Sequence, residues 1–160
     1  MPATRAFWPL MPGVMAHSDD EWFDREQLHF AADDGDIVRV RELVAEGYDV
    51  NLFDEDISLT PLHYAVRGEY FAVSKFLLEN GANVNAHEEE KIGETPLGDV
   101  AATCSFEMAE LLILAGADPT IPGWMNLTPL DRARRRKDDE GRKVYELLEK
   151  TARKKFKYAP

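Results

Sequence analysis

The chain has 160 residues, of which 44% are hydrophobic and 10% aromatic, and its net charge is −11. This is enough apolar material for one folded domain, so the composition excludes a wholly disordered chain. The single cysteine, Cys104, excludes an internal disulfide and favours a reducing compartment, so we expect a cytoplasmic protein.

Residues 1–25 are predicted to form an N-terminal extension or cap. Their apolar stretch is interrupted by Pro9 and Pro12, which favours an N-terminal arm over a cleaved signal peptide. Ser18 and Glu21 have the spacing of a capping box, which predicts a short helical turn. No apolar run reaches the roughly 20 residues that a membrane-spanning helix needs, so we expect no membrane partner.

The same tripeptide, Thr-Pro-Leu, begins at Thr60, Thr95 and Thr128, at intervals of 35 and 33 residues. A period in the low thirties predicts a stacked array of repeats. Threonine caps helices and proline fits a helix's first turn, so each tripeptide predicts the start of a helix. In the best-defined unit a second helix is predicted over 71–80, with Gly81 ending it.

This pattern resembles the ankyrin repeat. The family's hallmark, Thr-Pro-Leu-His-x-Ala, occurs intact at 60–65, and its closing Gly-Ala-Asn-Val-Asn occurs at 81–85. The resemblance implies an all-α fold, an ankyrin-repeat solenoid of stacked helix-turn-helix units with protruding loops or β-turns. It also implies a non-enzymatic module that binds a protein partner and needs no cofactor.

The motifs place an ankyrin-repeat domain at 26–152, followed by a basic C-terminal tail at 153–160. Four repeats are predicted, the first and last of them degenerate or capping, with approximate boundaries 26–59, 60–94, 95–127 and 128–152. In the third repeat, Gly98 and Asp99 replace the histidine and the apolar residue that the family usually has. In the fourth, the late position of its Leu-Leu pair predicts two extra residues in the turn between the helices.

The predicted core consists of the apolar positions that recur along the repeats, because each unit buries its apolar stripe only by stacking on its neighbours. These positions are Leu28, Ala31, Val40, Leu43, Leu62, Ala65, Val73, Leu77, Leu97, Met108, Leu112, Leu130, Ala133, Val144 and Leu147.

The sequence predicts no catalytic, cofactor-binding or metal site. His29 and His63 occupy the helix-opening position of their repeats, where the resemblance implies that the side chain ties repeats together. Cys104 has no CxxC partner and stands at a turn where the family commonly has glycine. His87 lies beside three glutamates, 88–90, but this group lacks the spacing of a closed metal site.

In ankyrin arrays, by resemblance, partners bind to the loop tips ahead of each first helix and to the exposed side of that helix. Tryptophan and methionine are common anchors at such interfaces, and acidic tips favour a basic partner. We therefore expect an unbound monomer that binds a protein, for example as an inhibitor or immunity-type protein. The predicted partner-binding residues are Trp22, Phe23, Asp56, Ile57, Leu59, Arg67, Lys91, Ile92, Glu94, Trp124, Met125, Leu127, Arg135 and Arg136.

The charge of the chain is unevenly distributed. Residues 1–127 carry 24 acidic and 7 basic side chains, a net charge of −17, whereas residues 128–160 carry a net charge of +6. The acidic body makes nucleic acid an unlikely partner, because it repels a phosphate backbone. Two alternatives stay open: an anionic ligand or nucleic acid bound by the basic fourth repeat around Arg132–Lys137, and a regulatory subunit of an enzyme on another chain.

Overall fold

The computed structural model describes residues 21–91 and 93–160 of the chain. Within them the chain forms α-helices and one short 3₁₀ turn but no strand, so the all-α prediction is confirmed. In chain order the elements are α1 (Glu21–Arg25), α2 (Gln27–Asp33), α3 (Ile37–Ala45), α4 (Pro61–Arg67), α5 (Phe71–Glu79), α6 (Pro96–Val100), α7 (Phe106–Leu114), η1 (Trp124–Asn126), α8 (Pro129–Arg134) and α9 (Asp139–Lys155).

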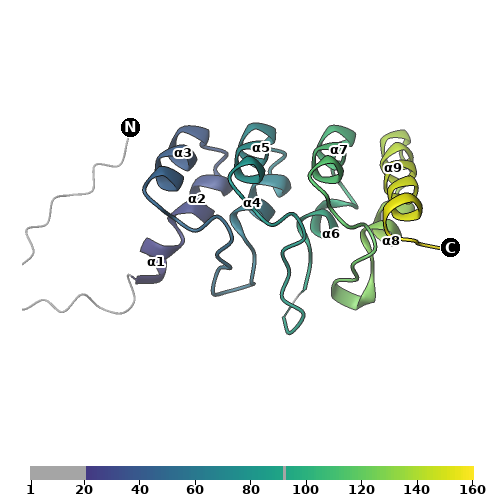
Figure 1. Ribbon diagram of the computed structural model, residues 1–160, viewed down its shortest axis with the longest axis horizontal. Helices are drawn as coiled ribbons and strands as arrows, with labels where there is room; N and C mark the ends of the chain where they lie inside the picture. The colour runs from purple at the N-terminus through teal and green to yellow at the C-terminus, as the bar shows by residue number, and fades with distance from the viewer. Residues whose placement is uncertain (1–20, 92) are drawn as a thin grey trace, which may run out of the picture.

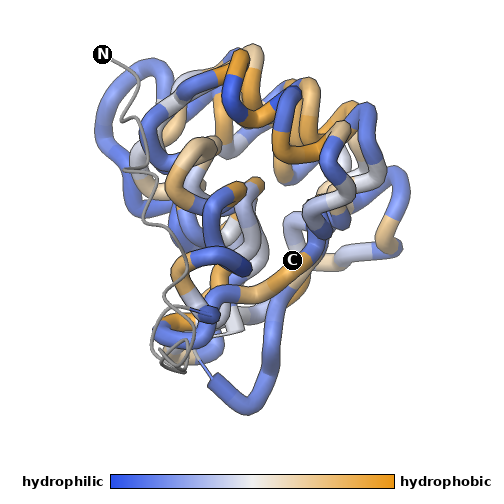
Figure 2. Tube along the Cα trace, turned by 90° about the vertical axis from the view of Figure 1, so that its left-hand side faces the viewer, coloured by the Kyte–Doolittle hydropathy of each residue, from blue (hydrophilic) through white to orange (hydrophobic). Residues whose placement is uncertain are grey.

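The helices form two layers along an elongated array (Figure 1). An inner layer holds α2, α4, α6 and α8, and an outer layer holds α3, α5, α7 and α9. Three loops project from the array on the side away from the outer layer, and we call them the first finger (51–59), the second finger (85–94) and the third finger (118–127). The second finger extends furthest in Figure 1 and is hydrophilic along most of its length in Figure 2.

The helix boundaries follow from the residues that the repeat motif supplies. The Thr95 hydroxyl oxygen accepts a hydrogen bond from the Gly98 amide at 3.0 Å, and Thr128 caps α8 in the same way. The prolines that follow fill the first helical position, where an amide proton has no partner within the helix. Gly81 and Gly116 end the second helices of their repeats with φ of +90° and +96°, which favours glycine.

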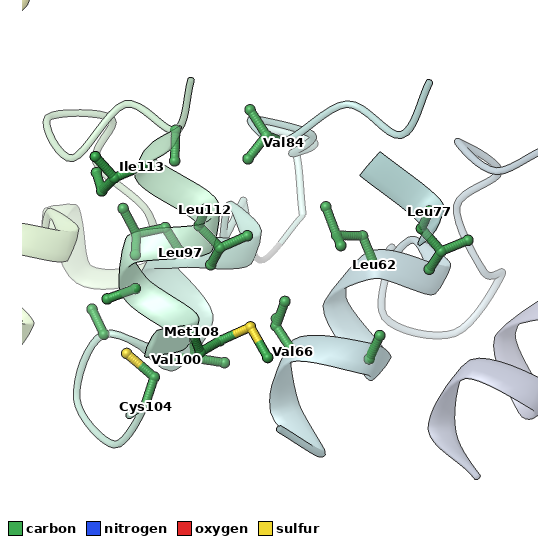
Figure 3. Packing of buried hydrophobic residues seen from close by; sticks show 14 of the residues in the cluster. Leu62, Val66, Leu77, Val84, Leu97, Val100, Cys104, Met108, Leu112 and Ile113 are labelled. Atoms are coloured by element: carbon green, nitrogen blue, oxygen red, sulfur yellow. The ribbon is translucent and has the colours of Figure 1, made fainter. Parts of the chain in front are cut away.

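The predicted core is confirmed at every position but one. In Figure 3, the Leu62 side chain extends from the second repeat toward the third, Leu97 lies beside Leu112 within the third, and Met108 points across toward the second repeat. Leu147 is the exception, because it is only half-buried while its neighbour is fully buried. One cluster of buried side chains runs from the first repeat to the last, as stacking requires.

The predicted insertion in the last repeat is wrong. Asp139 begins α9 eleven residues after Thr128, and Phe71 begins α5 eleven residues after Thr60, so the second helix starts at the same distance from the motif in both repeats. The difference lies in the helix, because α9 has 17 residues and α5 has 9. The longer helix buries Leu148 one turn further along, and it continues past residue 152, where the sequence placed the end of the repeat domain.

The described residues place limits on two further expectations. No helix that they form is long and apolar enough to cross a membrane. The predicted N-terminal arm and the Ser18 of the predicted capping box lie outside the described residues.

Candidate protein-binding surface

The three fingers are joined to one another at their bases by asparagine side chains. The Asn51 amide nitrogen donates to the Gly81 carbonyl at 2.9 Å, and its oxygen accepts from the Asn83 backbone amide at 2.6 Å. Asn85 makes the same pair of bonds to the next repeat, at 3.2 and 2.7 Å. Each finger base is therefore fixed relative to its neighbour through main-chain groups that a helix end leaves unpaired.

The first finger folds around the buried carboxylate of Asp54. This carboxylate accepts hydrogen bonds from the Ile57 amide at 2.8 Å, the Leu59 amide at 3.1 Å and the Tyr64 hydroxyl at 3.0 Å. The resulting turn directs Leu59 inward, where it is 1% exposed, so the prediction that Leu59 contacts a partner is wrong. Asp56 is exposed at the tip and Ile57 is half-buried.

Glu94, at the end of the second finger, is also buried rather than exposed, at 6%. One of its carboxylate oxygens forms an ion pair with Arg132 and accepts a hydrogen bond from the Trp124 amide at 3.0 Å. A Cβ atom on Gly98 or Gly123 would lie 2.7 or 2.4 Å from this carboxylate, so a side chain at either position would displace the carboxylate from its present place. The missing histidine of the third repeat thus makes room for Glu94.

The Glu94 carboxylate has a structural role in place of the partner contact that the sequence predicted. Burial raises the pKa of Glu94, and the Arg132 guanidinium and the Trp124 amide partly oppose that shift. The ion pair links the end of the second finger to α8, and the Trp124 amide links it to the third finger. Glu94 therefore holds the third finger in place.

The tip of the third finger presents two large exposed side chains. Trp124 is 60% exposed and Met125 is 68% exposed, whereas Leu127 is half-buried. Met125 has φ of +59°, an uncommon conformation for a residue with a side chain. The turn is closed by hydrogen bonds from the Gly123 amide to the Leu127 carbonyl and from the Asn126 amide to the Gly123 carbonyl, both 3.0 Å.

A groove of about 450 Å³ lies between the second and third fingers. Its walls include Glu89 and Lys91 from the second finger and Trp124 and Met125 from the third. The groove thus brings together predicted partner-binding residues from two repeats. Ile92, which was predicted to belong to the same surface, lies outside the described residues.

A second aromatic surface lies at the N-terminal end of the array. Trp22, Phe23 and Phe30 form a cluster with ring centroids 5.4–6.2 Å apart, and all three are between 39% and 45% exposed. Phe30 was not among the residues predicted from the sequence, although it occupies the position that Tyr64 holds in the next repeat. The Trp22 ring also lines a pocket of about 210 Å³ whose other walls are Glu26, Glu55 and Asp56.

The predicted residues on the first helices differ in how accessible they are. Arg67 is half-exposed and forms a two-bond ion pair with Asp99, which explains why an acid replaces the family's apolar residue there. Arg135 is exposed. The Arg136 side chain is only 9% exposed, because it donates to the Cys104 carbonyl at 2.7 Å and pairs with Asp138 at 2.8 Å. Arg136 is therefore a structural residue, contrary to the prediction.

The basic fourth repeat offers fewer accessible charges to an anion than its sequence suggests. Arg132 and Arg136 are held by acidic side chains and by carbonyls within the array. Arg134, Arg135 and Lys137 remain exposed. Within residues 132–137, a site for a phosphate or a nucleic acid would depend on these three side chains, on a chain whose net charge is −11.

A comparison with known protein families identifies the family to which this fold belongs. A model of the family described as "Ankyrin repeats (3 copies)" matches residues 28–123. The chain belongs to the ankyrin-repeat family. Repeats of this family generally mediate protein–protein interactions, and the helix pair α8 and α9 extends the ankyrin stack beyond the matched residues.

Several ankyrin-repeat proteins are similar to this chain. It is 38% identical over 91 residues to the Ankyrin repeat and KH domain-containing protein mask-1 of Caenorhabditis elegans, covering 57% of this chain and 3% of that protein. It is 37% identical over 106 residues to an ankyrin repeat protein of Rickettsia felis, covering 61% and 46%. It is 40% identical over 87 residues to Palmitoyltransferase Hip14 of Drosophila melanogaster, covering 54% and 13%. The chain thus spans less than half of each of these relatives.

The histidines of this ankyrin array have the linking role that the sequence predicted. His63 Nδ1 accepts from the Thr60 amide at 3.0 Å, and its Nε2 lies 2.8 Å from the Glu94 carbonyl in the next repeat. Burial lowers the pKa of His63 from 6.5 to about 4, so the ring is neutral at pH 7. His29 Nε2 lies 2.7 Å from the Leu52 carbonyl of the first finger.

The side chains that most often serve as nucleophiles or metal ligands are not arranged for these roles in the described residues. Cys104 is buried, and burial raises the pKa of its thiol to about 11, which disfavours the reactive thiolate. Over the part of the chain that the structure describes, no three histidine, cysteine or acidic side chains gather as metal ligands would.

Proposed function

We propose that this ankyrin-repeat chain is a binding protein without catalytic activity of its own. It recognises a protein partner through the finger tips and the grooves between them. The observation that carries this proposal is the pair Trp124 and Met125, 60% and 68% exposed on a finger that buried Glu94 holds in place. Large side chains on a fixed support lose little conformational freedom on binding, so they are effective anchors.

The partner is expected to be basic. The second finger carries three consecutive glutamates, 88–90, beside the groove that Trp124 lines, and the first finger carries exposed Glu55 and Asp56. The aromatic face of Trp22 is flanked by Glu55 and Asp56. This combination suits the guanidinium group of an arginine, because that group can stack on an aromatic ring and also pair with carboxylates. An inhibitor or immunity-type protein with a basic target fits this chemistry.

The same charges support the rest of the proposal. An acidic finger surface would speed association with a basic protein and repel nucleic acid. We expect the unbound chain to be a cytoplasmic monomer, because its single cysteine favours a reducing compartment and its net charge of −11 makes copies of the chain repel one another.

Affinity capture tests this proposal, with the wild-type chain and matched variants used on extract from the source cell. Trp124→Ala removes the anchor, and Val38→Ala removes an equally exposed side chain, at 64%, from the outer layer. A Glu88/Glu89/Glu90→Lys triple variant reverses the charge of the second finger. The proposal predicts a protein that wild type and Val38→Ala retain and that the other two variants lose; retention by all four would contradict it.

A further inference from the structure

The outer helix layer carries an apolar groove between α5 and α7, on the side of the array away from the fingers (Figure 1). Its volume is about 490 Å³, and its apolar walls are Phe71 of α5 with Leu111 and Leu114 of α7. Leu114 is 79% exposed and Phe71 is 46% exposed. An uncovered apolar surface of this kind usually indicates a partner.

The groove exists because these two helices do not close on each other. The helix α7 packs much more closely on α9 than on α5. At one end of the groove, the Glu69 carboxylate reaches from the second repeat to the Ser105 amide at 3.0 Å and the Ser105 hydroxyl at 2.6 Å. This polar bridge links the repeats and leaves the apolar side chains beside it uncovered.

The fold does not require leucine at position 114. Leu114 is the ninth residue of α7, and the ninth residues of α5 and α3 are Glu79 and Ala45. The two preceding repeats therefore have a charged or a small residue at the same exposed position. Because the Leu114 side chain is mostly in water, packing within this chain does not explain its presence.

The rim of the groove is acidic. Glu69, Glu107 and Glu110 line it, and no lysine or arginine does. The helix α7 carries two glutamates and no basic residue along its length. A partner that covers Phe71 and Leu114 would therefore meet the negative charges of Glu107 and Glu110 on α7, which favours basic residues next to its apolar ones.

We propose that this groove is a second protein-binding surface, which takes a basic amphipathic helix of a partner. Two helices of nine residues, each about 13 Å long, form a trough that fits two to three turns of a third helix. The apolar stripe of that helix covers Phe71, Leu111 and Leu114, and flanking lysines or arginines reach Glu107 and Glu110. This surface is separate from the fingers, so the chain can bind two partners at once.

Binding of a defined helical probe tests the inference. The probe is a fluorescein-labelled 18-residue peptide of leucine and lysine with leucines on one helical face, and its titration with the full chain is followed by fluorescence anisotropy. Leu114→Gln should weaken binding about tenfold, because one buried leucine is worth about that factor. Val38→Gln changes an equally apolar exposed residue outside the groove and should leave the affinity within twofold.

Two further measurements decide between occupants. Backbone amide chemical shifts should move on α5 and α7 when the peptide is added, and Trp124→Ala should bind it as wild type does. Equal effects of Leu114→Gln and Val38→Gln, or shifts confined to the fingers, would overturn the inference. So would a self-associating wild type that Leu114→Gln makes monomeric in sedimentation, because the groove would then take a second copy of the chain.

Discussion

Two neighbouring junctions of the array link adjacent repeats through different chemical groups. Between the second and third repeats, the neutral ring of His63 bonds to the Glu94 carbonyl. Between the third and fourth, the equivalent histidine is replaced by Gly98, and the side chain of the same Glu94 pairs with Arg132. The neutral junction connects a helix to a finger. The charged junction connects a finger to a helix and also holds the Trp124 amide, so the replacement of histidine by Gly98 allows the third finger to be fixed as well.

The two junctions should respond to acid with opposite sign. His63 has a lowered pKa, so between pH 6.5 and about 4 the unfolded chain binds more protons there and acid destabilises the fold. Glu94 has a raised pKa, so above its ordinary value the folded chain binds more protons at that carboxylate. Falling pH therefore weakens the first junction while Glu94 opposes that loss.

The largest effect is expected from the apolar core that both junctions share. Leu112 is fully buried between the helix layers, and Leu112→Ala leaves a cavity there (Figure 3). We expect a loss of about 3–5 kcal/mol in the free energy of unfolding, measured by urea denaturation. A loss below about 1 kcal/mol would mean that the side chain is not packed as described.

Arg132→Met tests the charged junction. It leaves the Glu94 carboxylate buried without its cation, and we expect a loss of about 2–4 kcal/mol, since Arg132 keeps some contact with solvent. The double variant Glu94→Gln/Arg132→Met removes both charges and should be more stable than the sum of the two single losses predicts. Strict additivity would show that the two side chains do not interact.

His63→Gln tests the neutral junction through pH. Between pH 7 and pH 4 the wild type should lose up to about 3 kcal/mol more unfolding free energy than the variant, because only the wild type has a buried ring to protonate. Urea denaturation at several pH values measures the difference. Parallel pH profiles for the two proteins would contradict a buried neutral His63.

Arg67→Met tests a third link, an exposed ion pair between the second and third repeats, and should have the smallest effect on stability. The Arg67 side chain is 42% exposed, and its ion pair with Asp99 is open to salt. We expect a loss of about 0.5 kcal/mol in urea denaturation, with half of it or more removed in 0.5 M salt. A loss as large as that of Arg132→Met would erase the distinction between exposed and buried pairs.

The sequence predicts the helix layers well because their residues repeat with the motif. Each of the three Thr-Pro pairs of the chain starts a helix, and Leu112 takes its buried position from helical spacing. The surface is harder to predict, because a loop position does not say which way a side chain turns. Leu59 and Glu94 each stand just before a motif threonine, yet a buried Asp54 turns the first inward and an arginine 38 residues away draws in the second.

The glycines are the one signal by which the Glu94 site is detectable in the sequence. Gly98 and Gly123 are 25 residues apart, and both approach the same carboxylate because neither has a side chain. Gly98 is visible in the sequence as a departure from the family pattern, but spacing alone does not connect it with Gly123 or Arg132. The exposure of Leu114 is also hard to predict from the sequence. Its apolar character fits the helix pattern, but its exposure depends on the distance between α5 and α7.

The affinity of the chain for the captured partner measures whether the fingers bind that protein through Trp124. Calorimetric titration compares the wild type with Trp124→Ala and with Val38→Ala, two changes at side chains of similar exposure, 60% and 64%. If Trp124 is an anchor, Trp124→Ala should weaken binding at least about tenfold and Val38→Ala less than about twofold. Equal affinity of all three proteins would instead place the binding site away from Trp124 and its finger.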